Sequence, residues 1–324
     1  MRAIVVEQRG GPDVLQPGEW PAPSPGAGQL LVNVAAAGVN FMDIYQREGR
    51  PPYGSGPLPY VPGAEGAGTV AAIGAGTSGF AEGDPVAWTG VPGSYAEQVA
   101  IPADRAVRVP GSVGLETAAA VMLQGLTAHY LCHSTYPIQP GDVAVVHAAA
   151  GGVGLLLTQM IVMLGGTVVA TTSTADKAEL ARAAGAAHVT GYDDFGAVAR
   201  EVTGGAGAAV VYDSVGQATF DASLAALRPR GYLVLYGGSS GPVPPFDPMQ
   251  LAAHGSLFLT RPTMGSYIAT PEELHQRAGD LLRWIQSGQL SVRVGGRYPL
   301  ADAGRAQADL AARRTTGKLL LLPG

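Results

Sequence analysis

A glycine-rich loop joins an apolar strand pattern to an apolar helix pattern near the middle of the chain. The segment HAAAGGVG, residues 147–154, follows the run VAVV at 143–146 and precedes the apolar stretch 155–164. Glycine costs backbone entropy, so three glycines in four residues indicate that something must approach the backbone closely. A tight strand–helix turn without a ligand would also use glycines, and the motif alone does not separate the two.

The sequence around this loop alternates between Val- and Leu-rich runs and helical patterns. Continuous apolar runs of this kind are typical of parallel strands that are buried on both faces. Two such halves predict a doubly wound Rossmann-type parallel sheet. The expected strands are 143–149, 167–173, 188–192, 208–215 and 232–238, and the expected helices are 151–165, 175–186, 195–204 and 217–231.

The sequence pattern at the two ends of the chain differs from that of the middle. Short strands separated by Pro- and Gly-rich turns fill the first ~120 residues, which favours an all-β barrel or sandwich. Helices are expected at 115–135, 270–288 and 300–314, with a closing strand at 317–324. A chain of 324 residues suits two domains, and β texture at both ends predicts that the C-terminal strands return to the first domain.

Composition excludes several classes of protein. Charged residues make up 14% of the chain and the net charge is −5, which argues against a nucleic-acid partner. No apolar run approaches the ~20 residues of a membrane span, and the first residues fit a strand better than a signal peptide. The single cysteine, Cys132, rules out an intrachain disulfide and fits a reducing, cytoplasmic location.

The loop and the strand after it indicate a dinucleotide cofactor. Ala149, Gly151 and Gly154 form an A-x-G-x-x-G variant of the dinucleotide fingerprint, between a strand and a helix as its mechanism requires. Thr172 stands at the end of the next strand, where an NAD site usually places an acid. Hydroxyls and a cation can bind a 2′-phosphate through hydrogen bonds, and Lys177 opens the helix that follows. An isolated lysine can equally be a solvated helix residue. The loop therefore predicts NADPH.

Four segments carry a family resemblance. HAAAGGVG, VYDSVG, RPTMGSYIATPEEL and AAAGVNFMDIYQREG closely resemble the zeta-crystallin-like NADPH:quinone oxidoreductases, a zinc-free branch of the medium-chain dehydrogenase/reductase superfamily. The resemblance runs through essentially the whole chain. It implies an α/β protein with a GroES-like β-barrel catalytic domain (1–125 and 263–324), a Rossmann NADPH-binding domain (126–262) and an inter-domain cleft. It also implies a homodimer, for which the apolar segment 255–263 suits pairing at a sheet edge.

The resemblance also implies roles for individual residues. Asn40, Tyr45 and Thr127 are the implied catalytic residues at the nicotinamide and substrate side, with Asp43 supporting their loop. Gln124 departs from the lysine of several members and is expected to affect which substrate is accepted; Ser173 replaces a glycine of some members. The implied cofactor-binding residues are Asn40, Thr127, Gly151, Gly152, Val153, Ser173, Lys177, Tyr192, Ser214, Tyr236, Gly237 and Met264.

No metal is expected. The zinc alcohol dehydrogenases of this superfamily hold a structural zinc with four cysteines, and this chain has one cysteine. At their catalytic zinc positions the resemblance places Asn40, Ala64 and Gln124 instead of ligands, although Glu65 survives. Without a Lewis acid the chain is poorly equipped to polarise an alcohol, whereas hydride delivery to an electron-poor quinone or activated alkene is feasible.

Other polar and aromatic residues have simpler explanations. His129 and His133 share a helix face near Cys132, where packing against the sheet is favoured over a metal pair, and His147 is expected to satisfy backbone groups. Ser214 lacks the full G-x-S-x-G of a nucleophile elbow. The loop tyrosines can cap surface turns or stack on a flat quinone; Tyr45 is assigned to function, and the choice stays open for Tyr53, Tyr60 and Tyr267.

The sequence thus predicts NADPH-dependent quinone reduction by hydride transfer, with the proton supplied by water. A 2-alkenal or enoyl reductase is the alternative within the same superfamily, and it would need a proton donor, for which Tyr45 is the candidate. A non-enzymatic nucleotide-sensing or RNA-binding role is the other alternative. The acidic balance of the chain argues against it.

Overall fold

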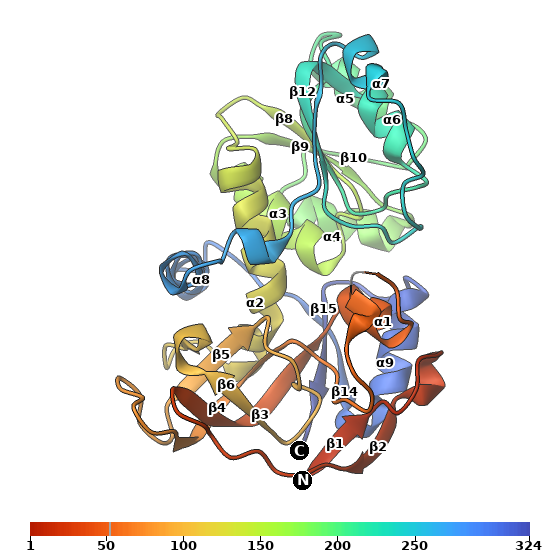
Figure 1. Ribbon diagram of the computed structural model, residues 1–324. Helices are drawn as coiled ribbons and strands as arrows, with labels where there is room; N and C mark the ends of the chain where they lie inside the picture. Colours follow the sequence, from red (N-terminus) through yellow and green to blue (C-terminus); the bar gives the residue numbers. More distant parts are fainter. Residues whose placement is uncertain (52) are drawn as a thin grey trace. The chain divides into compact units, whose positions relative to one another are not determined.

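The computed structural model describes residues 1–51 and 53–324, and the chain divides into two compact units. Unit 1 comprises Met1–Gln124 and Ile268–Gly324, and unit 2 comprises Gly125–Tyr267. In Figure 1 the two parts of unit 1 are coloured red to yellow and blue, and unit 2 runs through green. In residues 1–51 and 53–324, no helix combines the length and the apolar character needed to cross a membrane.

Unit 2 is built on a six-stranded sheet in which all neighbouring strands are parallel. The strand order β10-β9-β8-β11-β12-β13 places the first strand of the unit, β8, beside the fourth, which is the doubly wound Rossmann order. Helices lie against the sheet (Figure 1). The strands are β8 (Val143–Val146), β9 (Thr167–Thr171), β10 (His188–Thr190), β11 (Ala208–Asp213), β12 (Leu227–Leu235) and β13 (Phe258–Thr260), and the helices are α3 (Gly152–Met163), α4 (Ala175–Ala183), α5 (Phe195–Val202), α6 (Phe220–Ala225) and α7 (Met249–Ala253).

The Rossmann prediction is confirmed, with one local error. The helix expected over 217–231 is only the short α6, and β12 already begins at Leu227. Pro229 explains the difference, because proline in a helix interior removes a hydrogen bond and clashes with the preceding turn. The next residue, Arg230, has a positive φ of 60°, so the backbone turns sharply within β12, where the pairing with β11 shifts register between Ala208 and Val210.

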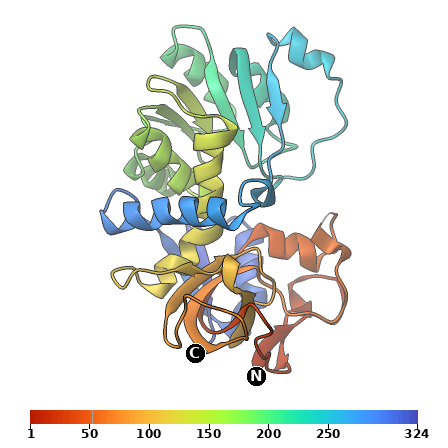
Figure 2. The same cartoon turned by 60° about the vertical axis from the view of Figure 1, so that its left-hand side comes forward.

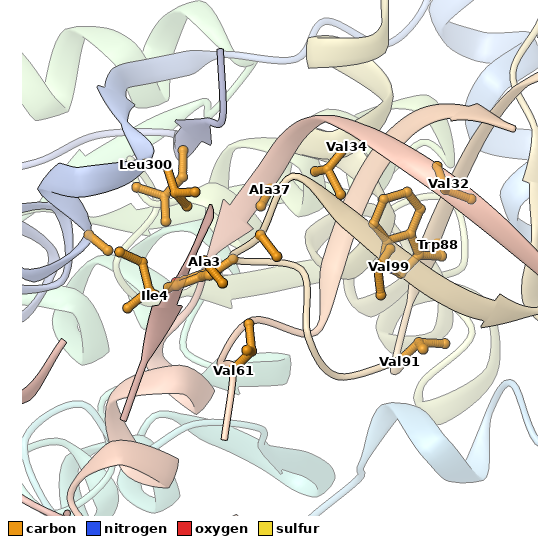
Figure 3. Close-up of a cluster of buried hydrophobic side chains, with 14 of the residues drawn as sticks. Ala3, Ile4, Val32, Val34, Ala37, Val61, Trp88, Val91, Val99 and Leu300 are labelled. Atoms are coloured by element: carbon orange, nitrogen blue, oxygen red, sulfur yellow. The ribbon is translucent and has the colours of Figure 1, made fainter. Parts of the chain in front are cut away.

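Unit 1 contains a seven-stranded sheet in the order β14-β15-β3-β4-β5-β7, with β6 paired to β3, and a separate β1–β2 pair. Apolar side chains from these strands, including Ile4, Val32, Val34 and Trp88, form its core (Figure 3). The strands are β1 (Arg2–Val5), β2 (Gln16–Glu19), β3 (Gln29–Val39), β4 (Glu65–Ile73), β5 (Pro85–Thr89), β6 (Gln98–Pro102), β7 (Val107–Arg108), β14 (Val294–Pro299) and β15 (Lys318–Leu322); the helices are α1 (Phe41–Arg47), α8 (Pro271–Gln286) and α9 (Ala303–Ala311), and α2 (Leu115–Tyr130) begins in this unit.

The last strand of the chain, β15, lies inside the seven-stranded sheet, between β14 and β3. β15 runs antiparallel to β3, with Leu319 opposite Val39 and Leu320 opposite Gly38. Both views show the two termini close together (Figures 1 and 2), and the Arg2 guanidinium donates to the carbonyl of Pro323. Segments about 280 residues apart therefore lie side by side in unit 1.

Candidate cofactor and substrate site

The glycine loop of unit 2 is shaped for close backbone packing at the start of α3. Gly151 is the N-cap of this helix, and a Cβ atom on Gly154 would lie 2.5 Å from the carbonyl oxygen of Ala148 and 2.7 Å from Cα of Ala149. Only glycine fits there, which matches the helix-packing role of the last glycine in the dinucleotide fingerprint. The free backbone N–H groups of the first turn of α3 form an environment that favours an anion.

A pocket of about 340 Å³ opens beside the carboxyl ends of β9 and β10. Its lining, as far as the structure describes it, carries hydroxyls and no carboxylate: Thr172, Ser173, Thr174, Ala175, Ala178, Val189, Thr190 and Gly191. The Lys177 ammonium donates to the Ser173 hydroxyl over 3.4 Å, and the Thr174 hydroxyl caps α4 by accepting the backbone N–H of Lys177. The structure thus brings the predicted residues Ser173 and Lys177 together at the amino end of α4.

The ends of β11 and β12 gather three more predicted residues. Tyr236 N–H donates to the carbonyl of Asp213, and Ser214 hydrogen-bonds the Tyr236 side chain. Burial raises the pKa of Tyr236, and this hydrogen bond opposes the rise. A Cβ atom on Gly237 would lie 2.6 Å from the Ser214 carbonyl oxygen, so glycine is required for this close approach.

The remaining predicted residues of unit 2 lie on separate elements. Thr127 is buried in α2, where its side chain hydrogen-bonds Tyr130. Tyr130 stacks in turn on Tyr267, with ring centroids 4.3 Å apart. Met264 begins a 3₁₀ turn, Met264–Ser266, and the Tyr192 ring lies 5.8 Å from the ring of His147.

His147 belongs to a buried network that sequence reasoning missed. Its Nδ1 lies 2.9 Å from the Thr171 hydroxyl and its Nε2 lies 3.0 Å from the Ser223 hydroxyl. Ser223 and Thr219 donate to Oδ2 of Asp213, so Ser223 can only accept from Nε2–H, and Thr171 donates to Nδ1. The expectation that His147 satisfies backbone groups is therefore wrong, because both ring nitrogens are used by hydroxyls. Burial lowers the pKa of His147 to about 4, against the pull of Asp213, so the ring is neutral at neutral pH.

In unit 1 the predicted residue Asn40 lies in a buried polar cluster with Glu65, Gln124 and Lys318. Its Oδ1 accepts from Gln124 Nε2 at 2.6 Å and from Lys318 Nζ at 2.8 Å, and its Nδ2 donates to Glu65 Oε2 at 3.1 Å and to the Gly38 carbonyl at 3.3 Å. The carboxamide thus uses its full hydrogen-bonding capacity within the protein. Lys318 was not predicted; a single lysine at the start of the strand KLLLL was the available signal.

Asn40 also begins helix α1, which carries the predicted residue Tyr45. The Asp43 carboxylate accepts the backbone N–H of Asn40 at 2.9 Å and the hydroxyl of Tyr95 at 2.8 Å. Burial raises the pKa of Asp43 to about 6, and the hydrogen bond from Tyr95 opposes the rise. The Tyr45 ring lies 6.0 Å from the ring of Tyr53, so α1 and the following turn present an aromatic pair.

Comparisons with known proteins cover the whole chain. Residues 26–111 match the alcohol dehydrogenase GroES-like domain, and residues 152–284 match the zinc-binding dehydrogenase family. A quinone oxidoreductase of Pseudomonas aeruginosa is 43% identical over 97% of both chains, and quinone oxidoreductase 1 of Escherichia coli is 41% identical over 99% of both. The chain belongs to the quinone oxidoreductases of the medium-chain dehydrogenase/reductase superfamily.

Two structures of this family superpose on the chain closely. A mycobacterial protein complexed with NADPH is 49% identical, with a TM-score of 0.96 and full coverage of both chains. The Escherichia coli quinone oxidoreductase complexed with NADPH is 40% identical, with a TM-score of 0.95 and full coverage. These similarities confirm the predicted fold class, a GroES-like domain with a Rossmann domain.

One of the two matched families is described as zinc-binding, so the metal-ligating side chains of this quinone oxidoreductase bear on its chemistry. In residues 1–51 and 53–324, no three or more His, Cys, Asp or Glu residues are placed to hold a metal ion. His129 and His133 stack with ring centroids 4.4 Å apart beside the buried Cys132. Burial raises the pKa of the Cys132 thiol, so this sulfur is a poor ligand.

We expect acid to destabilise unit 2 through His147, whose pKa is 6.5 ordinarily and about 4 when buried. Between these values a falling pH protonates the ring in the unfolded chain only, so the free energy of unfolding falls with pH. From about pH 7 to about pH 5 the loss is on the order of 1–2 kcal/mol. Urea denaturation of His147→Gln at both pH values should lack this loss; equal losses in variant and parent would contradict the assignment.

Proposed function

We propose that the chain catalyses the NADPH-dependent reduction of quinones by hydride transfer, without zinc. The observation that supports this most strongly is similarity over the full length to quinone oxidoreductases, two of whose relatives were crystallised with NADPH. The hydroxyl-lined pocket at α4, with Lys177 on its helix, supports the choice of NADPH over NADH.

The residues of unit 2 fit this cofactor. Gly151, Gly152 and Val153 at the start of α3 would hold the pyrophosphate, because the two glycines have no Cβ atoms and the amino end of a helix favours an anion. Ser173 and Lys177 would hold the 2′-phosphate. When bound, NADPH supplies the hydride. The other residues proposed to border it are Tyr192, Ser214, Tyr236 and Gly237 along the nucleotide, and Asn40, Thr127 and Met264 toward the nicotinamide.

On the acceptor side, the aromatic residues of α1 fit a flat quinone. The Tyr45 ring lies 6.3 Å from the ring of Phe41 and 6.0 Å from that of Tyr53, and offset stacking on such rings contributes about 0.5–1.5 kcal/mol beyond burial. The carboxamide of Asn40 is already fully hydrogen-bonded within the protein, so we propose that Asn40 acts by fixing the start of α1. Solvent water supplies the proton, and the protein positions the reactants.

Reduction of an activated alkene is a second candidate function. The observation that favours it is a 2-haloacrylate reductase of Burkholderia sp that is 40% identical over 99% of this chain and 98% of its own. Such a substrate shares with a quinone an electron-poor carbon that accepts hydride without a Lewis acid. The hydroxyl of Tyr45 would be the proton donor in this case.

The two candidates are separated by following NADPH oxidation with 1,4-benzoquinone, 9,10-phenanthrenequinone and a simple enal. We expect rapid loss of NADPH absorbance with the quinones, because these acceptors are electron-poor and flat. Turnover with the enal alone would transfer the function to alkene reduction. Tight NADPH binding without oxidation by any of these acceptors would overturn both candidates.

The cofactor preference is tested by Lys177→Met. Loss of one charge-assisted hydrogen bond to a phosphate should raise the KM for NADPH about tenfold or more. The KM for NADH, which lacks the 2′-phosphate, should stay within about twofold. Arg182→Ala removes a cation from the last turn of the same helix and serves as the control. If both variants weaken NADPH equally, the effect is one of overall charge.

We further propose that the protein acts as a homodimer in the cytoplasm. β13 is an edge strand, and its Phe258 side chain is 50% exposed while stacking on Tyr232 at 4.6 Å. An exposed apolar edge of this kind favours pairing with a second copy across a two-fold axis. The lone buried Cys132 suits a reducing compartment.

The dimer proposal predicts that Phe258→Arg yields a monomer in sedimentation velocity, because a charge at the edge strand opposes strand pairing. Met163→Arg places the same charge at a similarly exposed position on α3 and should leave the dimer intact. A dimer that survives Phe258→Arg would place the interface elsewhere.

A further inference from the structure

The ammonium of Lys318 is held by three oxygen atoms inside unit 1. Nζ donates to Oδ1 of Asn40 at 2.8 Å, to Oε1 of Gln124 at 2.8 Å and to Oε2 of Glu65. A lysine ammonium has three donors and no acceptor, so each of its hydrogens has one partner. Lys318 is 2% exposed and Glu65 is fully buried. The three oxygens therefore form an internal cation site, and the cation is a side chain of the chain itself.

The sheet register creates this site. Leu319 lies opposite Val39 in the β15–β3 pair, which places Lys318 across from Asn40, and Glu65 is the first residue of β4 on the other side of β3. Gly38 leaves room for them, because a Cβ atom there would lie 2.6 Å from Cε of Lys318. Segments from four parts of the chain thus converge on one nitrogen atom.

Stability alone does not account for the pair. Removing two charges from water costs several kcal/mol each, so a buried ion pair contributes little net stability relative to apolar residues of similar volume. Burial lowers the pKa of Lys318, and the Glu65 carboxylate, with a smaller contribution from Asp43, opposes this. Asn40 and Gln124 add only neutral amides around the nitrogen. The ammonium does fix the orientation of the Asn40 and Gln124 carboxamides, because the oxygen of each must face it.

The orientation of Asn40 affects helix α1, because Asn40 is its N-cap. With Oδ1 of Asn40 facing the ammonium, Nδ2 must face Glu65 and the Gly38 carbonyl, and a flipped amide would set N–H groups against a cation. Asn40 is the residue at which α1 begins, and Tyr45 lies on that helix. The amino end of α1 is therefore tied to β3, β4, β15 and α2 through a single carboxamide.

We propose that Lys318 is a positioning residue: its ammonium occupies the oxygen site of Asn40, Glu65 and Gln124 and thereby holds α1, with Tyr45, in place for the acceptor. The inference rests on the proposed function for its kinetic readout. We expect loss of Lys318 to lower kcat/KM for the acceptor. Binding of NADPH should change little, because Lys318 and its three partners all belong to unit 1.

The test compares Lys318→Met with the double variant Lys318→Met/Glu65→Gln. The single variant leaves a buried carboxylate without its cation and should lower the urea midpoint. The double variant removes both charges and should regain most of that midpoint. If positioning is the role, kcat/KM for 1,4-benzoquinone should stay about 10- to 100-fold down in the double variant, since small misplacements are costly. Its NADPH dissociation constant, from fluorescence titration, should stay within about twofold of the parent.

Lys177→Met is the matched control, because Lys177 and Lys318 are the two lysines of the sequence. It should weaken NADPH and leave the KM for the quinone unchanged, which is the reverse of the Lys318 pattern. Hydrogen exchange of the peptide spanning 40–50 gives a readout that needs no turnover. Faster exchange there in the double variant, with unit 2 peptides unchanged, is the expected result.

If the double variant keeps the parental rate of hydrogen exchange at 40–50 and the parental kcat/KM, the positioning role is overturned. Balancing the charge of Glu65 would then be the only role of Lys318. An inactive parent would instead overturn the proposed function, and the exchange of 40–50 would still decide the role of Lys318. The two failures are therefore distinguishable.

Discussion

The carboxylate of Asp213 fixes the edge of the parallel sheet where the loops of unit 2 emerge. Oδ1 accepts the backbone N–H groups of Val215 and Gly216, and Oδ2 accepts two hydroxyls, one of which bonds His147. Strands β8, β9 and β11 and helix α6 therefore meet at one buried anion. Because β8 and β11 flank the switch point of the sheet, the glycine loop starts from a rigid base.

In unit 1, strands also meet at a buried charged group, which here is a cation. There, strands β3, β4 and β15 meet at the ammonium of Lys318, and the carboxamides of Asn40 and Gln124 are oriented by it. The cation comes from β15, and Oε1 of Gln124 on α2 accepts one of its hydrogens. In both units a buried charged group sets the geometry of the neutral groups around it, and in unit 1 that group is itself paired with the Glu65 carboxylate.

The sequence allowed most of the fold to be predicted, since apolar runs and helical spacing are local signals. It failed where a local signal was overridden, as at Pro229, which ends the helix expected over 217–231. The candidate site was predictable where motif and topology coincide, as for Ser173 and Lys177. Lys318 was missed because its partners lie 194 to 278 residues away in the chain, and nothing local to a lysine reveals such a register.

The scarcity of lysine gives the chain an unusual chemical signature. Lys177 is only half-buried and lies beside the pocket at α4, whereas Lys318 is sealed inside unit 1. A mild acylating reagent therefore has one side-chain amine to modify in the folded protein, besides the N-terminus. Acylation at Lys177 would neutralise the cation of that pocket, and acylation at Lys318 would report that unit 1 has opened. Each fold unit thus carries its own built-in amine probe.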